Sequence, residues 1–215
     1  MQLIVISHPN IVANEAQLIN QLFETGLKRF HLRKPDWDEK QLIDLLGQID
    51  DAFYPHIALH QHHHITTDFN IKRLHYTEKH RLDTEPDKLI FQKEEGYVLS
   101  TSIHLDKDLR SFKNFVSLTQ NITDTSPLFD YMFFGPVFNS ISKPGYQGQL
   151  PDDFRLLPNT AIQVIALGGV EQSNLHQLKT IGFDGVAVLG TIWNDPGRAI
   201  TSFNKLQEHL LIKHP

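Results

Sequence analysis

Three apolar segments in the second half of this chain each end in residues that suit phosphate binding. Residues 130–134 lead into Gly135-Pro136 and then into a loop with two hydroxyls and an amine, from Ser140, Ser142 and Lys143. Residues 164–167 lead into Gly168-Gly169, and residues 183–188 lead into Leu189-Gly190. A phosphate needs converging N–H donors, and glycine lets the backbone approach it without a Cβ in the way. The three segment ends together predict a phosphate-binding rim, although a glycine pair alone is also compatible with a plain tight turn.

A cationic side chain follows an earlier apolar run, Arg29–Arg33. A guanidinium suits bidentate contact with a phosphate, so Arg33 is interpreted as functional rather than structural.

Histidines are numerous: the chain has 13, and four of them crowd His60-Gln61-His62-His63-His64. On an extended strand, His60 and His62 would face the same way, as in a zinc-activated hydrolase. A third ligand would then be needed, and His104 and His80 are the candidates. The plainer interpretation is a polar surface loop whose histidines contact water.

Composition excludes several other classes of function. The chain has 215 residues, a formal net charge of -5 and no cysteine. The charge gives no basic face for nucleic acid, and no apolar run approaches the roughly 18 residues of a membrane span. The sequence opens directly on an apparent strand without the features of a signal peptide. We therefore expect a cytoplasmic protein with neither nucleic acid nor membrane as a partner; the pattern makes no prediction of oligomeric state.

Short apolar runs alternate with helical patterns along the whole chain. Eight runs are expected to be strands: Leu3–Ser7, Arg29–Arg33, His56–His60, Lys72–Tyr76, Tyr97–Thr101, Asp130–Gly135, Gln163–Leu167 and Gly185–Leu189. Helical spacing is expected at Ala13–Glu24, Asp38–Asp51, Glu171–Ile181 and Thr201–Leu211. This order predicts an α/β protein, a single (β/α)8 TIM-barrel domain over residues 1–215. An open doubly wound sheet is the alternative.

Read in order, the strand ends resemble those of the thiamine phosphate synthase and thiazole tautomerase superfamily, which are small TIM barrels of thiamine biosynthesis. The resemblance is strongest at Asp130–Lys143, Val164–Val170 and Asp184–Ile192, and weaker at Phe30–Lys34 and Ser100–His104. It implies a transferase that couples hydroxymethylpyrimidine diphosphate to thiazole phosphate and releases diphosphate. Its partners would be these small phosphorylated substrates.

The resemblance also implies roles for particular residues. The backbone at Gly168, Gly169, Leu189 and Gly190 would hold the thiazole phosphate, with Ser140, Ser142 and Lys143 in the same pocket. Arg33 and Lys34 would face the diphosphate, and Ser102 would lie near the pyrimidine or the diphosphate. His31, His104 and Pro136 complete the expected substrate pocket; Pro136 stands where synthases have proline and tautomerases have histidine.

The expected Mg²⁺ site departs from the family pattern. Synthases carry Asn-Asp after the third strand and an acid after the fourth, whereas this chain has His60-Gln61 and His80, with Glu78 offset. His60, His80 and Glu78 are thus the remaining candidate metal ligands. Mg²⁺ prefers oxygen donors, so the metal half of the site is predicted to be degenerate. The alternatives are a tautomerase-like protein, a non-catalytic binder of thiazole phosphate, or a metal-dependent hydrolase that uses the His60/His62 pair.

Overall fold

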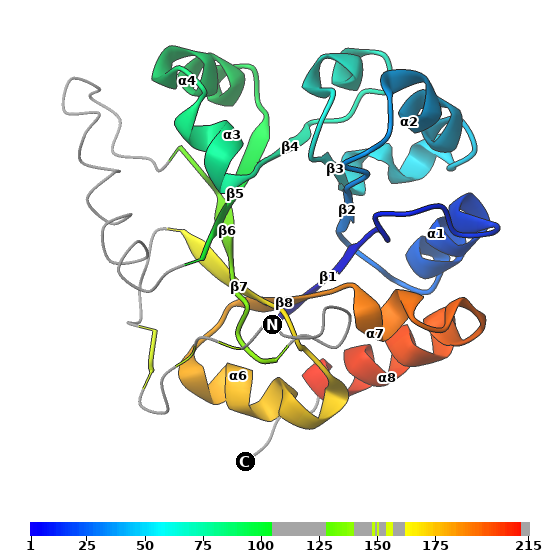
Figure 1. The fold of residues 1–215 in the computed structure, drawn as a ribbon, viewed down its shortest axis with the longest axis vertical. Coiled ribbons are helices and arrows are strands. Elements are labelled where there is room, and N and C mark those ends of the chain that lie inside the picture. The colour runs from blue at the N-terminus through cyan, green and yellow to red at the C-terminus, as the bar shows by residue number, and fades with distance from the viewer. Residues whose placement is uncertain (105–127, 140–147, 149, 151–153, 157–161, 212–215) are drawn as a thin grey trace.

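Eight parallel strands form a closed barrel, in which each strand pairs with the next along the chain and β8 pairs with β1 (Figure 1). The computed structural model describes residues 1–104, 128–139, 148, 150, 154–156 and 162–211. The strands are β1 Gln2–Ile6, β2 Phe30–Leu32, β3 Ile57–Leu59, β4 Arg73–Tyr76, β5 Val98–Ile103, β6 Tyr131–Phe134, β7 Gln163–Leu167 and β8 Gly185–Val188. Every predicted strand is present within two residues at each end, which confirms the TIM barrel and not the open sheet.

Helices lie outside this barrel (Figure 1). They are α1 Glu15–Glu24, α2 Glu39–Leu46, α3 Glu78–Leu82, α4 Pro86–Glu94, α6 Leu175–Ile181, α7 Gly190–Trp193 and α8 Ala199–Leu211. The four expected helical segments correspond to α1, α2, α6 and α8. Helices α3 and α4 were not predicted, because α4 is polar and carries only one buried residue, Leu89. None of the helices in the described part of the chain is long and apolar enough to cross a membrane.

Several connections contain 3₁₀ turns: η1 Asp51–His56, η2 His63–Thr67, η3 Gln172–Asn174 and η4 Pro196–Arg198. The predicted helix over residues 38–51 is shorter than expected. It begins with a capping box between Asp38 and Gln41 and ends at Leu46, and a separate 3₁₀ turn leads into β3. The crossover from β3 to β4 consists of η2 alone, which agrees with its short sequence.

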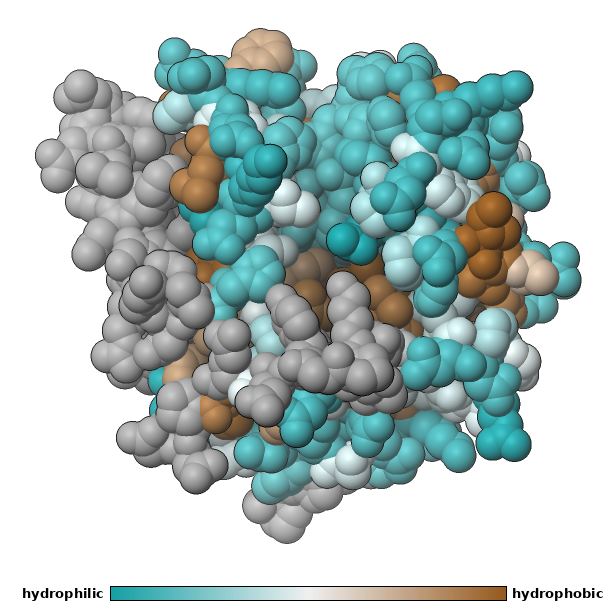
Figure 2. Space-filling view, in the orientation of Figure 1, coloured by the Kyte–Doolittle hydropathy of each residue, from teal (hydrophilic) through white to brown (hydrophobic). Residues whose placement is uncertain are grey.

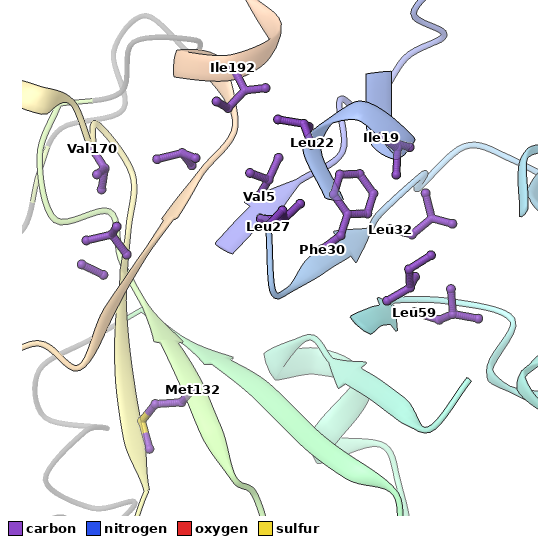
Figure 3. Close-up of a cluster of buried hydrophobic side chains, with 14 of the residues drawn as sticks. Val5, Ile19, Leu22, Leu27, Phe30, Leu32, Leu59, Met132, Val170 and Ile192 are labelled. Atoms are coloured by element: carbon purple, nitrogen blue, oxygen red, sulfur yellow. The ribbon is translucent and has the colours of Figure 1, made fainter. Parts of the chain in front are cut away.

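The larger hydrophobic core lies between the barrel and its helices. Figure 3 shows Val5, Leu22 and Phe30 from β1, α1 and β2 packed together, and all three are fully buried. Each such side chain stabilises the fold by about 1.5–3 kcal/mol. Hydrophilic residues cover most of the described surface in Figure 2, and hydrophobic surface is visible within a central hollow.

Inside the barrel the packing is mixed. An apolar cluster joins β1, β6, β7 and β8 through Ile4, Ile6, Tyr131, Phe133, Ile165 and Ala187. Polar side chains from β2 to β5 are also buried, namely His31, His60, His75 and Ser100. This half-polar interior positions the site described next.

Candidate active site at the carboxyl end of the barrel

A cavity of about 400 Å³ is lined by every strand of the barrel or by the residue that follows it. The contributors in strand order are Ile6, Arg33, His60, His75, Ser102, Phe133, Leu167 and Ala187. The turns after the strands add Thr77, His104, Gly135, Pro136, Gly168, Gly169, Val170, Leu189, Gly190 and Thr191. The loops at this end of a TIM barrel usually form the active site.

Two glycines shape the wall of the cavity after β7. Gly168 and Gly169 have φ values of +97° and +63°, which L side chains rarely adopt. A Cβ on Gly168 would come within 2.8 Å of Pro136, and one on Gly169 would lie 2.7 Å from the Phe138 Cβ and still closer to the Asn139 carbonyl oxygen. The backbone of the turn after β7 therefore packs directly against the turn after β6. This close packing is by itself sufficient to require glycine at both positions.

The structure brings most of the predicted substrate residues to this one cavity. Arg33, Ser102, His104 and Pro136 line it together with the four predicted phosphate-binding residues Gly168, Gly169, Leu189 and Gly190. Arg33 is half-buried, and its backbone is fixed by Ser7, whose hydroxyl accepts from the Arg33 N–H at 2.8 Å and donates to the Arg33 carbonyl at 2.9 Å. Ser140, Ser142 and Lys143 lie outside the described residues.

Lys34 is not placed where the sequence pattern predicted it. Its side chain is fully buried away from the cavity lining, and its ammonium donates to Glu15 at 2.5 Å and to the Asn10 carbonyl at 2.9 Å. The cation also lies 4.5 Å from the centre of the Trp37 ring. Desolvation raises the pKa of Glu15 and lowers the pKa of Lys34, so burial outweighs the attraction between the two charges. Lys34 thus joins the start of α1 to the end of β2.

Three histidines meet beneath the cavity. His31 Nδ1 lies 2.9 Å from His60 Nε2, and His31 Nε2 lies 2.8 Å from the Tyr131 hydroxyl. The His75 ring stacks on the His60 ring at 4.0 Å and contacts Ser100 and Ser102 through its two nitrogens, at 2.9 and 3.0 Å. His31 is therefore below the floor of the predicted substrate pocket, while His60 and His75 form part of that floor.

The remaining histidines of residues 60–64 diverge. The strand ends at Leu59, and His62 adopts a left-handed conformation with its ring against the Trp37 carbonyl, at 3.3 Å. His63 packs on Tyr76, and His64 forms an exposed pair with Glu39 at 2.7 Å. The structure does not bring His60 and His62 together as a metal pair, because the chain leaves the extended conformation before His62.

The other predicted metal ligands also separate. Glu78 pairs with His104 Nδ1 at 2.7 Å, and His80 stacks on the His63 ring at 5.3 Å, outside the cavity lining. Among the described residues, the set of His, Asp and Glu side chains able to share one metal ion is His31, His60 and His75, with one ligand atom of each within 4.8 Å of the others.

Sequence reasoning missed His75 and Tyr131. Both lie on predicted strands. The alternation of side chains along a strand was the signal for His75, since it places Arg73 and His75 on the same face of β4.

Comparison with known proteins agrees with this geometry. The sequence model of the family described as "Thiamine monophosphate synthase" matches residues 2–192. A thiamine-phosphate synthase of Hyphomonas neptunium is 33% identical over 88 residues, which are 38% of each chain. One from Clostridium tetani is 31% identical over 64 residues, 29% of this chain and 31% of the relative. The chain thus aligns with about a third of the length of these curated relatives.

Solved structures show the same fold. Thiamine phosphate pyrophosphorylase from Bacteroides thetaiotaomicron has a TM-score of 0.71 and 24% identity over 100% of both chains. The enzyme from Pyrococcus furiosus has a TM-score of 0.67 and 13% identity over 97% of this chain and 95% of its own. Since the family's sequence model spans nearly the whole barrel, this chain belongs to the thiamine monophosphate synthase family.

Proposed function

We propose that this protein is a thiamine phosphate synthase, which couples hydroxymethylpyrimidine diphosphate to thiazole phosphate and releases diphosphate. The observation that carries this proposal is the gathering of Arg33, Ser102 and the glycine turns after β7 and β8 around one cavity in a chain of this family.

The thiazole phosphate is assigned to the turns at Gly168-Gly169 and Leu189-Gly190. Both turns line the cavity, and each contains glycine, which leaves the backbone open to a ligand. Phosphate sites in TIM barrels often use the loops after strands seven and eight. This supports backbone N–H groups as the phosphate donors.

Arg33 is assigned to the diphosphate of the pyrimidine substrate. In the proposed reaction the bond between the pyrimidine methylene carbon and the diphosphate oxygen breaks, and its electron pair leaves with the diphosphate. The thiazole nitrogen then donates its lone pair to the methylene cation. Arg33 stabilises the departing charge, and Ser102, held by His75 at 3.0 Å, contacts the pyrimidine or the diphosphate. Lys143 is proposed to assist Arg33, with Ser140 and Ser142 beside the thiazole phosphate.

Magnesium does not fit the donors that the structure describes. Mg²⁺ takes oxygen ligands, mostly carboxylates and water. No Asp or Glu is among the described residues that line the cavity, and the Glu78 carboxylate is paired with His104. We therefore assign no step of the reaction to Mg²⁺.

A direct assay tests the proposal. Purified protein is incubated with both precursors, with and without Mg²⁺, and thiamine phosphate is measured. Product is expected from the wild type and from Arg198→Met, an exposed arginine outside the cavity, but not at a comparable rate from Arg33→Met. Equal rates for all three proteins would contradict the assignment of Arg33.

The absence of a carboxylate from the described lining favours a second candidate, a tautomerase-like protein or non-catalytic binder of thiazole phosphate. Calorimetry together with the product assay separates the two candidates: the second candidate binds thiazole phosphate and yields no thiamine phosphate.

Since the proposed substrates are phosphorylated and cross membranes poorly, we place the protein in the cytoplasm.

A further inference from the structure

Apart from the contact of His75 with Ser102, the histidine cluster beneath the cavity has no role in the proposed synthase chemistry. His31 comes from β2, His60 follows β3 and His75 comes from β4, so three neighbouring strands aim an imidazole at one point of the barrel interior. All three residues are buried, with exposed fractions of 0, 7 and 1%. A polar group at such a position needs partners, because an unpaired one costs about 1–3 kcal/mol.

Hydrogen bonding within the cluster is incomplete. A neutral imidazole has one donor and one acceptor. If His31 donates to Tyr131, it must accept from His60; if Tyr131 donates to His31, then His31 donates to His60. In both cases His60 Nδ1 is left over, and this buried atom has no partner. The His60 ring also lines the cavity, so the unpaired nitrogen belongs to a side chain at the boundary between cluster and cavity.

Burial favours the neutral form of the three rings, which is the form that ligates metals. Desolvation lowers the pKa of His31 and His60 well below the usual value, and that of His75 to about 3. Polar neighbours orient the rings in the way that outer partners orient metal-bound histidines. The Tyr131 hydroxyl would hold the outer nitrogen of a metal-bound His31. Either Ser100 or Ser102 would hold the outer nitrogen of His75, and the metal would replace the contact with the other serine.

We propose that His31, His60 and His75 bind one divalent transition-metal ion of the zinc class. Imidazole nitrogens favour such ions, and they disfavour Mg²⁺. Three protein ligands would leave a fourth position, and the exposure of His60 and His75 to the cavity lets water or an anion occupy it. The proposal rests on the described side chains alone and does not depend on the synthase reaction.

Binding of the ion requires the three histidine rings to move closer together, and nearby arginine cations oppose it. Zinc lies about 2.0–2.1 Å from each nitrogen, so ligand atoms now within 4.8 Å must close to roughly 3.3 Å. Arg33 lies near His60, and Arg29 and Arg73 lie near His31. These cations weaken the site, so its affinity should fall short of that of a structural zinc centre. The competing interpretation is a metal-free hydrogen-bonded core.

Spectroscopy on the folded protein distinguishes the two interpretations. Metal-free wild-type protein is titrated with Co²⁺ while the visible d–d absorption is recorded, and Zn²⁺ is then added. We expect one equivalent of Co²⁺ to bind and to give the intense absorption bands of a low-symmetry site. One equivalent of Zn²⁺ should then displace the Co²⁺ and abolish these bands. Electron paramagnetic resonance with Cu²⁺ should show coupling to three nitrogens.

Matched variants assign the ion to the cluster. His75→Asn should reduce the Zn²⁺ affinity at least tenfold. A His62→Asn/His64→Asn double variant, which removes the partly buried His62 and the exposed His64 outside the cluster, should keep it. If His75→Asn does not fold, the titration of the wild type still tests metal binding. Circular dichroism of the wild type shows that the protein is folded before metal is added. Failure of the folded wild type to bind, or loss of binding only in the double variant, would overturn the proposal.

Discussion

Replacing Lys34 by Met separates a substrate-binding lysine from a structural one. The sequence pattern placed Lys34 against the diphosphate, whereas its ammonium is buried against Glu15 at 2.5 Å. We expect Lys34→Met to destabilise the fold by about 3–5 kcal/mol, because it leaves a buried carboxylate without its cation. The Glu15 Oε1 atom already lacks a hydrogen-bond partner, so the carboxyl is incompletely satisfied even with Lys34 in place.

The double variant Glu15→Leu/Lys34→Met should recover most of that loss. Desolvation is the largest influence on the pKa of both groups and opposes ionisation of each. The ion pair therefore stabilises the fold about as much as apolar side chains of similar size would. The free energy of unfolding of the double variant should lie within about 1 kcal/mol of the wild-type value or exceed it. The expected coupling energy between the two sites is therefore several kcal/mol.

The pH dependence of stability has a defined sign. The pKa of Glu15 is raised in the folded state, and it rises further without Lys34. An acid with a raised pKa contributes stability below its unfolded value of about 4.5 and loses it as the pH rises through the folded value. The deficit of Lys34→Met should therefore be larger at pH 8 than at pH 5.

Urea unfolding at both pH values measures these changes, and calorimetry measures substrate affinity on the folded fraction. Lys28→Met, a matched change at an exposed lysine, should alter stability by less than about 0.5 kcal/mol. A Lys34→Met protein that is as stable as the wild type but no longer binds pyrimidine diphosphate would refute the structural reading of this residue.

Further variants probe the cavity and its surroundings. Arg33→Met should lower the rate of thiamine phosphate formation by about 10²–10³ through lost stabilisation of the departing diphosphate, and steady-state kinetics would show an undiminished rate if the assignment is wrong. Gly169→Ala should destabilise the fold by about 1–3 kcal/mol and weaken thiazole phosphate binding, because Gly169 has a positive φ and a Cβ there would meet Asn139. Gly197→Ala is the control, since its Cβ would meet only Asp195 at 3.4 Å, and it should change neither property. Thermal unfolding measures the stability and calorimetry measures the binding. His63→Asn should destabilise by about 1–3 kcal/mol, since it removes the ring packed on Tyr76, while His64→Asn at the exposed pair with Glu39 should be nearly neutral in urea unfolding.

The sequence alone determined the barrel and one side of its site. Each strand is a local apolar run closed by a turn, and such local patterns are visible without knowledge of distant residues. The glycine turns after β7 and β8 were predicted for the same reason, since their glycines are visible in the sequence itself. At Gly168 and Gly169 the backbone conformation requires glycine. Arg33 and Ser102 reached the cavity because they stand at the carboxyl ends of parallel strands, and closure brings all of these ends together.

Tertiary structure alone decided which polar side chains face the barrel interior. His60 and His62 look equivalent on an extended chain, but the strand ends at Leu59 and only His60 points inward. The partners of His31 are His60 and Tyr131, which lie 29 and 100 residues away, and the partner of Lys34 lies 19 residues before it. Desolvation and pairing are properties of a position in three dimensions, so no local pattern could show that Lys34 is buried or that three histidines converge.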